Sequence, residues 1–147
     1  MTKVKAIFGW RRAVLATVLI VATGAAQASA SSAPIVITYE KTCIEAAGIC
    51  NGTTGDGDTL TMVITGGRPT GKAVQLTMNE SIVGDLTFTA VLSGHFSPAG
   101  FIVLNGTVTG GPHAGAQVHQ RSNLTGVSID GTTTTWEGEL RIMPASS

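Results

Sequence analysis

The 147-residue chain has little charge, few aromatic side chains and almost no cysteine: 12% of its residues are charged, 5% are aromatic and two are cysteines. Positive charge is especially scarce once residues 1–30 are set aside. Those residues hold four of the nine Lys and Arg residues, so residues 31–147 carry five basic and nine acidic residues, a net charge near −4. Nucleic-acid binding requires a basic surface to neutralise phosphates. The composition therefore excludes a nucleic-acid partner.

The sequence also lacks an apolar stretch long enough to cross a bilayer as a helix. Its apolar run covers residues 13–26, about fourteen residues, whereas a transmembrane helix needs about twenty. Basic residues precede this run, and it is followed by Ala28-Ser29-Ala30, the small-x-small pattern that signal peptidase accepts. The pattern predicts a signal peptide over residues 1–30, cleaved after Ala30, and a single β domain over 31–147 with no stable membrane span.

Such a leader predicts a secreted, extracellular protein, or a periplasmic one if the source is a diderm bacterium. Arg11-Arg12 directly before the apolar run resembles a twin-arginine signal, so the general secretory and twin-arginine routes both stay open. An uncleaved leader would instead indicate an envelope-associated structural protein. All four asparagines begin N-x-[ST] sequons, whose glycosylation depends on the cell type: Asn51, Asn79, Asn105 and Asn123.

The two cysteines, Cys43 and Cys50, lie close together in the predicted exported domain. In an oxidising compartment an isolated close pair most simply forms one structural disulfide. A redox-active pair would need C-x-x-C spacing at a helix N-terminus, and neither feature is present. The sequence therefore predicts a Cys43–Cys50 disulfide.

No stretch from Pro34 onward shows a helical period, and alternation of period two dominates instead. In residues 85–93, for example, apolar residues alternate with Thr and Ser, as in a strand with one buried and one solvated face. We expect seven strands, at about 35–42, 58–65, 72–79, 85–93, 100–109, 115–124 and 132–143.

The chain also contains an internal repeat. Thr65-Gly66-Gly67 and the residues after it recur, with similar spacing, from Thr109-Gly110-Gly111 onward. The two segments are interpreted as hairpin turns, and each half as a three-strand unit in a pseudo-symmetric meander. The strand at 35–42 lies outside the repeat and is free to close the sheet.

Closure has a physical advantage, because an open sheet exposes two edges that invite aggregation and a barrel removes both. We therefore predict an all-β fold, a small antiparallel barrel of about seven to eight strands, with a two-sheet β-sandwich as the alternative. In size, leader and strand pattern the chain is similar to small extracellular barrels of the lipocalin and allene-oxide-cyclase or dirigent kind. That resemblance concerns architecture alone.

Catalytic and cofactor motifs are missing. The sequence has no G-x-S-x-G elbow and no phosphate loop, and its three histidines do not show the spacing of a zinc site. The Gly55-Asp56-Gly57-Asp58 segment lacks the carboxylates of an EF-hand and is interpreted as the turn before the strand at Thr59. Glu137 and Glu139 are interpreted as an exposed pair. No cofactor and no metal are expected.

One strand carries a conspicuous polar stripe. On residues 115–124 one face holds Gln117, His119, Arg121 and Asn123, and Ala116, Val118 and Leu124 lie on the other. The simpler interpretation is a solvated strand face. If the stripe pointed into a ligand-holding barrel, it would offer His119 and Arg121 as an acid/base group beside a cation, and Gln117 and Asn123 as further binding residues.

Two functions follow from these alternatives. The first is a secreted, non-catalytic binding protein that holds a small apolar ligand inside the barrel or a protein partner on its surface. The second is a small barrel enzyme of the isomerase or cyclase type that acts on an apolar small molecule through His119 and Arg121. The orientation of those two side chains distinguishes the two hypotheses.

Overall fold

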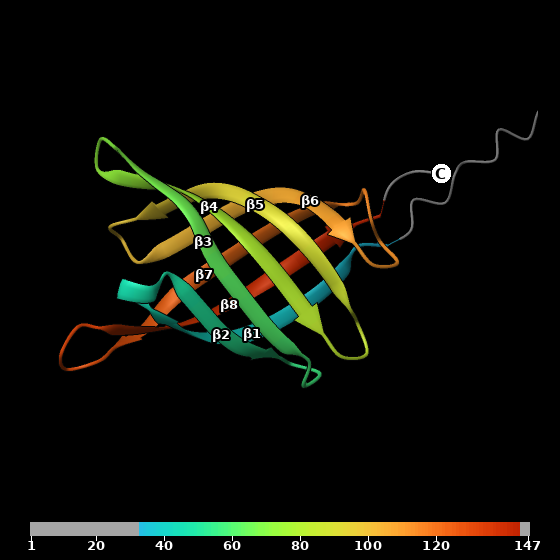
Figure 1. Ribbon diagram of the computed structural model, residues 1–147, viewed down its shortest axis with the longest axis horizontal. Coiled ribbons are helices and arrows are strands. Elements are labelled where there is room, and N and C mark those ends of the chain that lie inside the picture. Colours follow the sequence, from blue (N-terminus) through green and yellow to red (C-terminus); the bar gives the residue numbers. More distant parts are fainter. Residues whose placement is uncertain (1–32, 145–147) are drawn as a thin grey trace, which may run out of the picture.

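The chain folds as a closed, antiparallel, up-and-down barrel of eight strands in the order β1 to β8 (Figure 1). The computed structural model describes residues 33–144, so the predicted leader lies outside the described residues. Its elements are β1 (Ile35–Ile44), the short 3-10 helix η1 (Glu45–Ala47), β2 (Ile49–Thr54), β3 (Thr59–Thr70), β4 (Ala73–Val83), β5 (Phe88–Ser97), β6 (Phe101–Gly110), β7 (Gln117–Val127) and β8 (Thr133–Met143).

The barrel closes where the sequence suggested, because β1 pairs with β2 on one side and with β8 on the other. The prediction of a small antiparallel barrel is confirmed, and the two-sheet alternative is wrong. Seven of the eight strands correspond to predicted ones. The eighth, β2, is absent from the prediction. It contains Asn51 and Gly52, residue types that favour turns and loops when no partner strand is considered.

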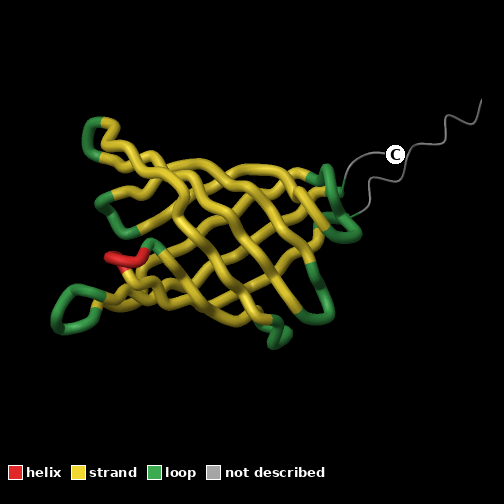
Figure 2. The backbone as a smooth tube through the Cα atoms, in the orientation of Figure 1, coloured by secondary structure: helices red, strands yellow, loops and turns green. Residues whose placement is uncertain are grey.

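The interpretation of the repeated Thr-Gly-Gly segments as hairpin turns is wrong for the first copy. Residues 65–67 lie within β3, where Thr65 forms a bulge between Ile64 and Gly66, and the turn comes later, between Thr70 and Ala73. A bulge lets an antiparallel strand bend without ending. The β3–β4 hairpin therefore extends past the barrel wall, as Figure 2 shows.

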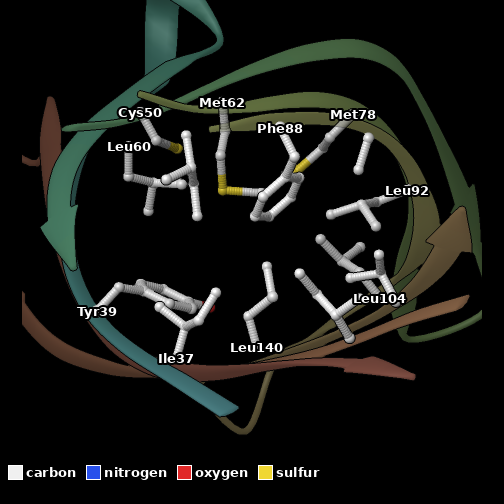
Figure 3. Packing of buried hydrophobic residues seen from close by; sticks show 14 of the residues in the cluster. Ile37, Tyr39, Cys50, Leu60, Met62, Met78, Phe88, Leu92, Leu104 and Leu140 are labelled. Atoms are coloured by element: carbon white, nitrogen blue, oxygen red, sulfur yellow. The ribbon is translucent and has the colours of Figure 1, made fainter. Parts of the chain in front are cut away.

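Side-chain alternation fills the interior. Along β1 every second residue from Ile37 to Cys43 is buried, and β5 and β7 show the same pattern over much of their length. Figure 3 shows apolar side chains from opposite sides of the wall meeting in the interior. At one position a missing side chain makes room for another: a Cβ at Gly138 would overlap the Tyr39 ring and hydroxyl.

The two ends of the barrel differ. The end that holds both the start of β1 and the end of β8, which we call the closed end, also carries the loops β2–β3, β4–β5 and β6–β7. Asp58 joins two of these loops, because its carboxylate accepts hydrogen bonds from the backbone N–H groups of Asp85 (2.9 Å) and Leu86 (3.0 Å). The opposite end carries η1 and the other three hairpins, and we call it the open end.

Candidate functional site

A cavity of about 440 Å³ occupies the open end of the barrel. All eight strands contribute to its wall, which is apolar except for Glu45 and Thr134. The apolar side chains come from the strand ends at the open end. There the alternation of inward-facing and outward-facing residues continues beyond the fully packed core. They include Ile64, Leu76, Phe96, Ile102, Leu124 and Trp136.

An aromatic pair forms part of this wall. The rings of Phe96 and Trp136 lie edge to face, with centroids 5.9 Å apart and planes at 79°. The Trp136 indole N–H donates to the Thr134 hydroxyl (2.8 Å), and that hydroxyl donates to the Glu45 carboxylate (2.9 Å). Because its single polar group is already satisfied, Trp136 presents an apolar ring to the cavity.

The predicted disulfide is confirmed, and it borders the cavity. Cys43 and Cys50 face each other across the β1–β2 ladder, and both are buried. The bond joins the end of β1 to the start of β2, on either side of η1. It therefore fixes this part of the cavity rim.

Polar side chains occupy the middle of the barrel, directly below the cavity. We call Lys41, Glu80 and Gln120, with the sulfur of Met62, the polar layer. The Gln120 amide N–H donates to Glu80 (2.9 Å), and the Lys41 ammonium donates to the Met62 sulfur (3.2 Å). The three polar residues are almost completely buried, with exposed fractions of 3% or less.

Two acceptor atoms of this layer are unpaired among the described residues, namely Oε1 of Glu80 and Oε1 of Gln120. Lys41 and Glu80 form no direct ion pair, because the ammonium approaches a methionine sulfur instead. Buried polar atoms are normally hydrogen-bonded, and an unpaired one destabilises the fold by about 1 to 3 kcal/mol. The polar layer is therefore unfavourable for stability alone.

Burial is the main influence on both charges. It lowers the pKa of the Lys41 ammonium to about 8, although the nearby Glu80 carboxylate favours the charged amine. It raises the pKa of the Glu80 carboxyl to about 7, although Lys41 and the hydrogen bond from Gln120 favour the carboxylate. Groups shifted towards neutral pH in this way are concentrated at functional sites.

A second buried contact lies beside the polar layer. The Tyr39 hydroxyl shares a hydrogen bond of 2.6 Å with the Ser122 hydroxyl, and the Lys41 ammonium lies 5.3 Å from the Tyr39 ring centroid. Burial raises the pKa of the Tyr39 phenol, so this side chain stays neutral at physiological pH. Tyr39 and Ser122 are satisfied structural neighbours of the polar layer.

Sequence reasoning missed the polar layer, although a signal for it exists. Lys41 continues the inward-facing positions Ile37 and Tyr39, and Glu80 lies between the inward-facing Met78 and Ile82. A charged residue at an apolar position of a two-residue period points into the core. The predicted strand at 35–42 contains Lys41, whereas the one at 72–79 ends one residue before Glu80.

The polar stripe of β7 lies on the outer surface of the barrel. Gln117, Arg121 and Asn123 are exposed, and His119 is half-buried, with its Nδ1 atom 2.7 Å from the Asn105 side-chain oxygen. The inward positions of β7 are taken by Val118, Gln120, Ser122 and Leu124. His119 and Arg121 therefore do not line the interior. The inward orientation that the enzyme hypothesis required is wrong.

The remaining sequence candidates stay apart from the cavity. Glu137 is exposed, and Glu139 pairs with Arg141 on the outer face of β8. Residues 33–144 contain no group of three or more His, Cys, Asp or Glu placed to hold a metal ion. Within the same residues, no helix has the length and apolar character of a membrane span.

Comparisons with known proteins add no family to this description. No protein-family model matches the chain, and neither a curated protein nor a solved structure matches it. The site is therefore interpreted from its own geometry.

Proposed function

We propose that the protein is an exported, non-catalytic binding protein that holds a small, mainly apolar molecule in the cavity at the open end. The single observation that carries this proposal is the cavity itself: about 440 Å³, enclosed by all eight strands and lined by apolar side chains with one aromatic pair. Sites for small molecules have volumes of roughly 300 to 1,000 Å³ and mostly apolar walls.

The chemistry of the wall supports a ligand without strong polarity at that position. The cavity wall offers few polar groups, and those of Trp136, Thr134 and Glu45 already bond to one another. Burial of an apolar ligand stabilises the complex by roughly 25 cal/mol per Å² removed from water. A ligand that presented charge to this wall would lose hydration without compensation.

A pair of neighbouring residues provides a matched test. Ile64 lines the cavity, whereas Val63 points outward on the same strand and is 39% exposed. Ile64→Trp should fill part of the cavity and weaken binding of the neutral fluorescent probe N-phenylnaphthylamine by about tenfold or more. Val63→Trp should leave the affinity unchanged. Equal effects of the two changes, or no saturable binding by the unmodified protein, would contradict the proposal.

Export and occupancy can be measured together. Intact mass spectrometry on protein from its own secretion medium should show a chain that starts at Ser31. A further mass that survives only under native conditions would identify a resident ligand and support the proposal. A chain that retains residues 1–30 would contradict export by a cleaved leader.

A further inference from the structure

The polar layer lies directly beneath the cavity. On three strands, the inward residue that contributes to the layer is followed, two positions towards the open end, by a residue of the cavity wall: Lys41 by Cys43, Met62 by Ile64 and Glu80 by Met78. Successive inward positions on a strand are about 7 Å apart. The inner end of the cavity therefore lies one inward position, about 7 Å along each strand, from the polar layer.

The layer contains both hydrogen-bond acceptors and hydrogen-bond donors that are not fully satisfied. Glu80 and Gln120 each have an oxygen that accepts no hydrogen bond. The Lys41 ammonium has three N–H donors, and its hydrogen-bond partner in the structure is the Met62 sulfur, a weak acceptor. A complementary group must therefore donate to at least one of these oxygens and accept from the ammonium at the same time.

Few ligand groups meet that requirement. A carboxylate accepts from Lys41 but has no proton to donate, and it brings a second negative charge close to Glu80. An ammonium donates to Glu80 but cannot accept, and it brings a second positive charge close to Lys41. An ether or carbonyl oxygen only accepts. A hydroxyl both donates and accepts without adding charge.

We infer that the cavity binds an apolar molecule that ends in a hydroxyl group, with the hydroxyl in the polar layer and the apolar part against the cavity wall. This inference rests on the proposed function. The hydroxyl donates to Oε1 of Glu80 or Gln120, and its oxygen replaces the Met62 sulfur as an acceptor for Lys41.

Methionine side chains belong to both the polar layer and the cavity wall, and their flexibility makes the passage between the two feasible. Met62 and Met78 both extend into the interior near Phe88, as Figure 3 shows, and Met78 also lines the cavity. An unbranched methionine changes rotamer at low energy and fills irregular gaps. The inner end of a ligand can therefore reach the layer by moving side chains, while the strands stay in place.

A ligand series on the unmodified protein tests the inference. At about pH 7.5, between the pKa values of Glu80 and Lys41, both groups are mainly charged. Competition against N-phenylnaphthylamine should then show n-decanol binding at least about tenfold more tightly than decane, decyl methyl ether, decanoate or decylamine, because each of these leaves buried polar groups unpaired. Equal affinities for decanol, decane and the ether would overturn the hydroxyl inference and leave the proposed function intact.

Two further outcomes of this experiment lead to different conclusions: tighter binding of a charged ligand, and no binding at all. Tighter binding of decanoate or decylamine than of decanol would also overturn the inference, because one charge of the layer would then dominate. If none of the five ligands displaces the probe, and the probe itself does not bind, the proposed function fails as well.

A double variant locates the preference in the layer. Lys41→Met with Glu80→Leu replaces the separated charges by apolar groups of similar size, a change that is often neutral or stabilising for a buried pair. The variant should lose most of the preference for decanol over decane, and only the Gln120 oxygen remains as an acceptor for the hydroxyl. The outward-facing neighbours provide the control: Glu40→Met with Asn79→Leu should keep the preference for decanol. An undiminished preference in the inner variant would overturn the assignment.

Discussion

The two ends of the barrel are built from the same eight strands, yet they differ in how the interior is filled. Near the closed end, Leu60, Ile82, Phe88 and Leu140 are each 1% exposed or less. At the open end, Ile64, Leu76, Phe96 and Leu124 are only half-buried and border the cavity. One end therefore supplies most of the packing that stabilises the fold. The other retains apolar surface that a ligand can cover.

The largest expected effect comes from exchanging one phenylalanine at each end for alanine. Phe88→Ala removes a fully buried ring and should lower the free energy of unfolding by about 3 to 5 kcal/mol, with the affinity for N-phenylnaphthylamine unchanged. Phe96→Ala should have a smaller effect on stability, because its ring is half-buried, and a clear effect on affinity. Urea unfolding and probe titration of both variants measure this contrast. Similar changes of affinity in the two would contradict the division of the barrel into a packing end and a binding end.

The polar layer between the two ends should give stability an unusual pH dependence. Glu80 holds its proton more tightly in the folded protein, so stability should fall as the pH rises from about 4.5 to about 7. Lys41 loses its proton more easily when folded, so stability should rise again from about pH 8 to about 10.5. Tyr39 is the other buried titratable group beside the pair, and burial keeps its phenol neutral over this range.

The expected profile therefore has a minimum between about pH 7 and 8, with a depth on the order of 3 kcal/mol. Urea unfolding across this pH range measures it. The variant that carries both Lys41→Met and Glu80→Leu should lack the minimum. A flat profile for the unmodified protein would mean that the layer is hydrated or already satisfied by a ligand.

Removal of the disulfide should loosen the open end more than the closed end. Cys43→Ser with Cys50→Ser opens a short loop, and should lower the free energy of unfolding by about 2 to 3 kcal/mol. Amide hydrogen exchange should accelerate in η1 and the adjoining parts of β1 and β2, while Leu60 and Ile82 remain protected. Reduction of the unmodified protein should reproduce the effect. Uniform acceleration throughout the barrel would contradict a local role.

The corresponding change at the closed end concerns Asp58. Asp58→Ala leaves the N–H groups of Asp85 and Leu86 without their acceptor and should lower the free energy of unfolding by about 2 kcal/mol. Asp58→Asn retains one acceptor and should have an intermediate effect. Asp56→Ala, at an exposed position of the same loop, is the control and should have almost none. Urea unfolding ranks the three variants. An effect of Asp56→Ala equal to that of Asp58→Ala would indicate a general loop effect.

Much of the fold could be predicted because alternation of period two is a local property of the sequence. It identified seven strands, and the cost of exposed edges favoured closure. The β2 strand could not be recognised locally, because Asn51-Gly52-Thr53 forms a strand only through pairing with β1 and β3. Tertiary pairing overrides weak β-propensity in such cases.

The candidate site was predicted less well, for a different reason. A small apolar ligand inside a barrel was one of the expectations, but the residues singled out were the polar ones on β7, which face solvent. An apolar cavity has no sequence motif of its own, because Ile64 and Leu124 cannot be distinguished in the sequence from residues of the packed core. The two-residue period could have identified Lys41 and Glu80 as inward-facing. Whether they lie close to each other depends on how the barrel closes.

The smallest expected effect concerns the outer surface of β7, and it tests whether binding belongs to the interior at all. His119→Ala and Arg121→Ala should each change the free energy of unfolding by less than about 0.5 kcal/mol, because both side chains lie on the solvent side of the wall. Neither should change the affinity for N-phenylnaphthylamine or the preference for decanol. The inward neighbour provides the contrast, since Gln120→Leu removes one of the unpaired oxygens of the polar layer and should weaken that preference. If Arg121→Ala lowered the affinity for the probe tenfold and Gln120→Leu left the preference for decanol unchanged, the outer depression lined by His119, Arg121 and Glu137 would replace the cavity as the binding site.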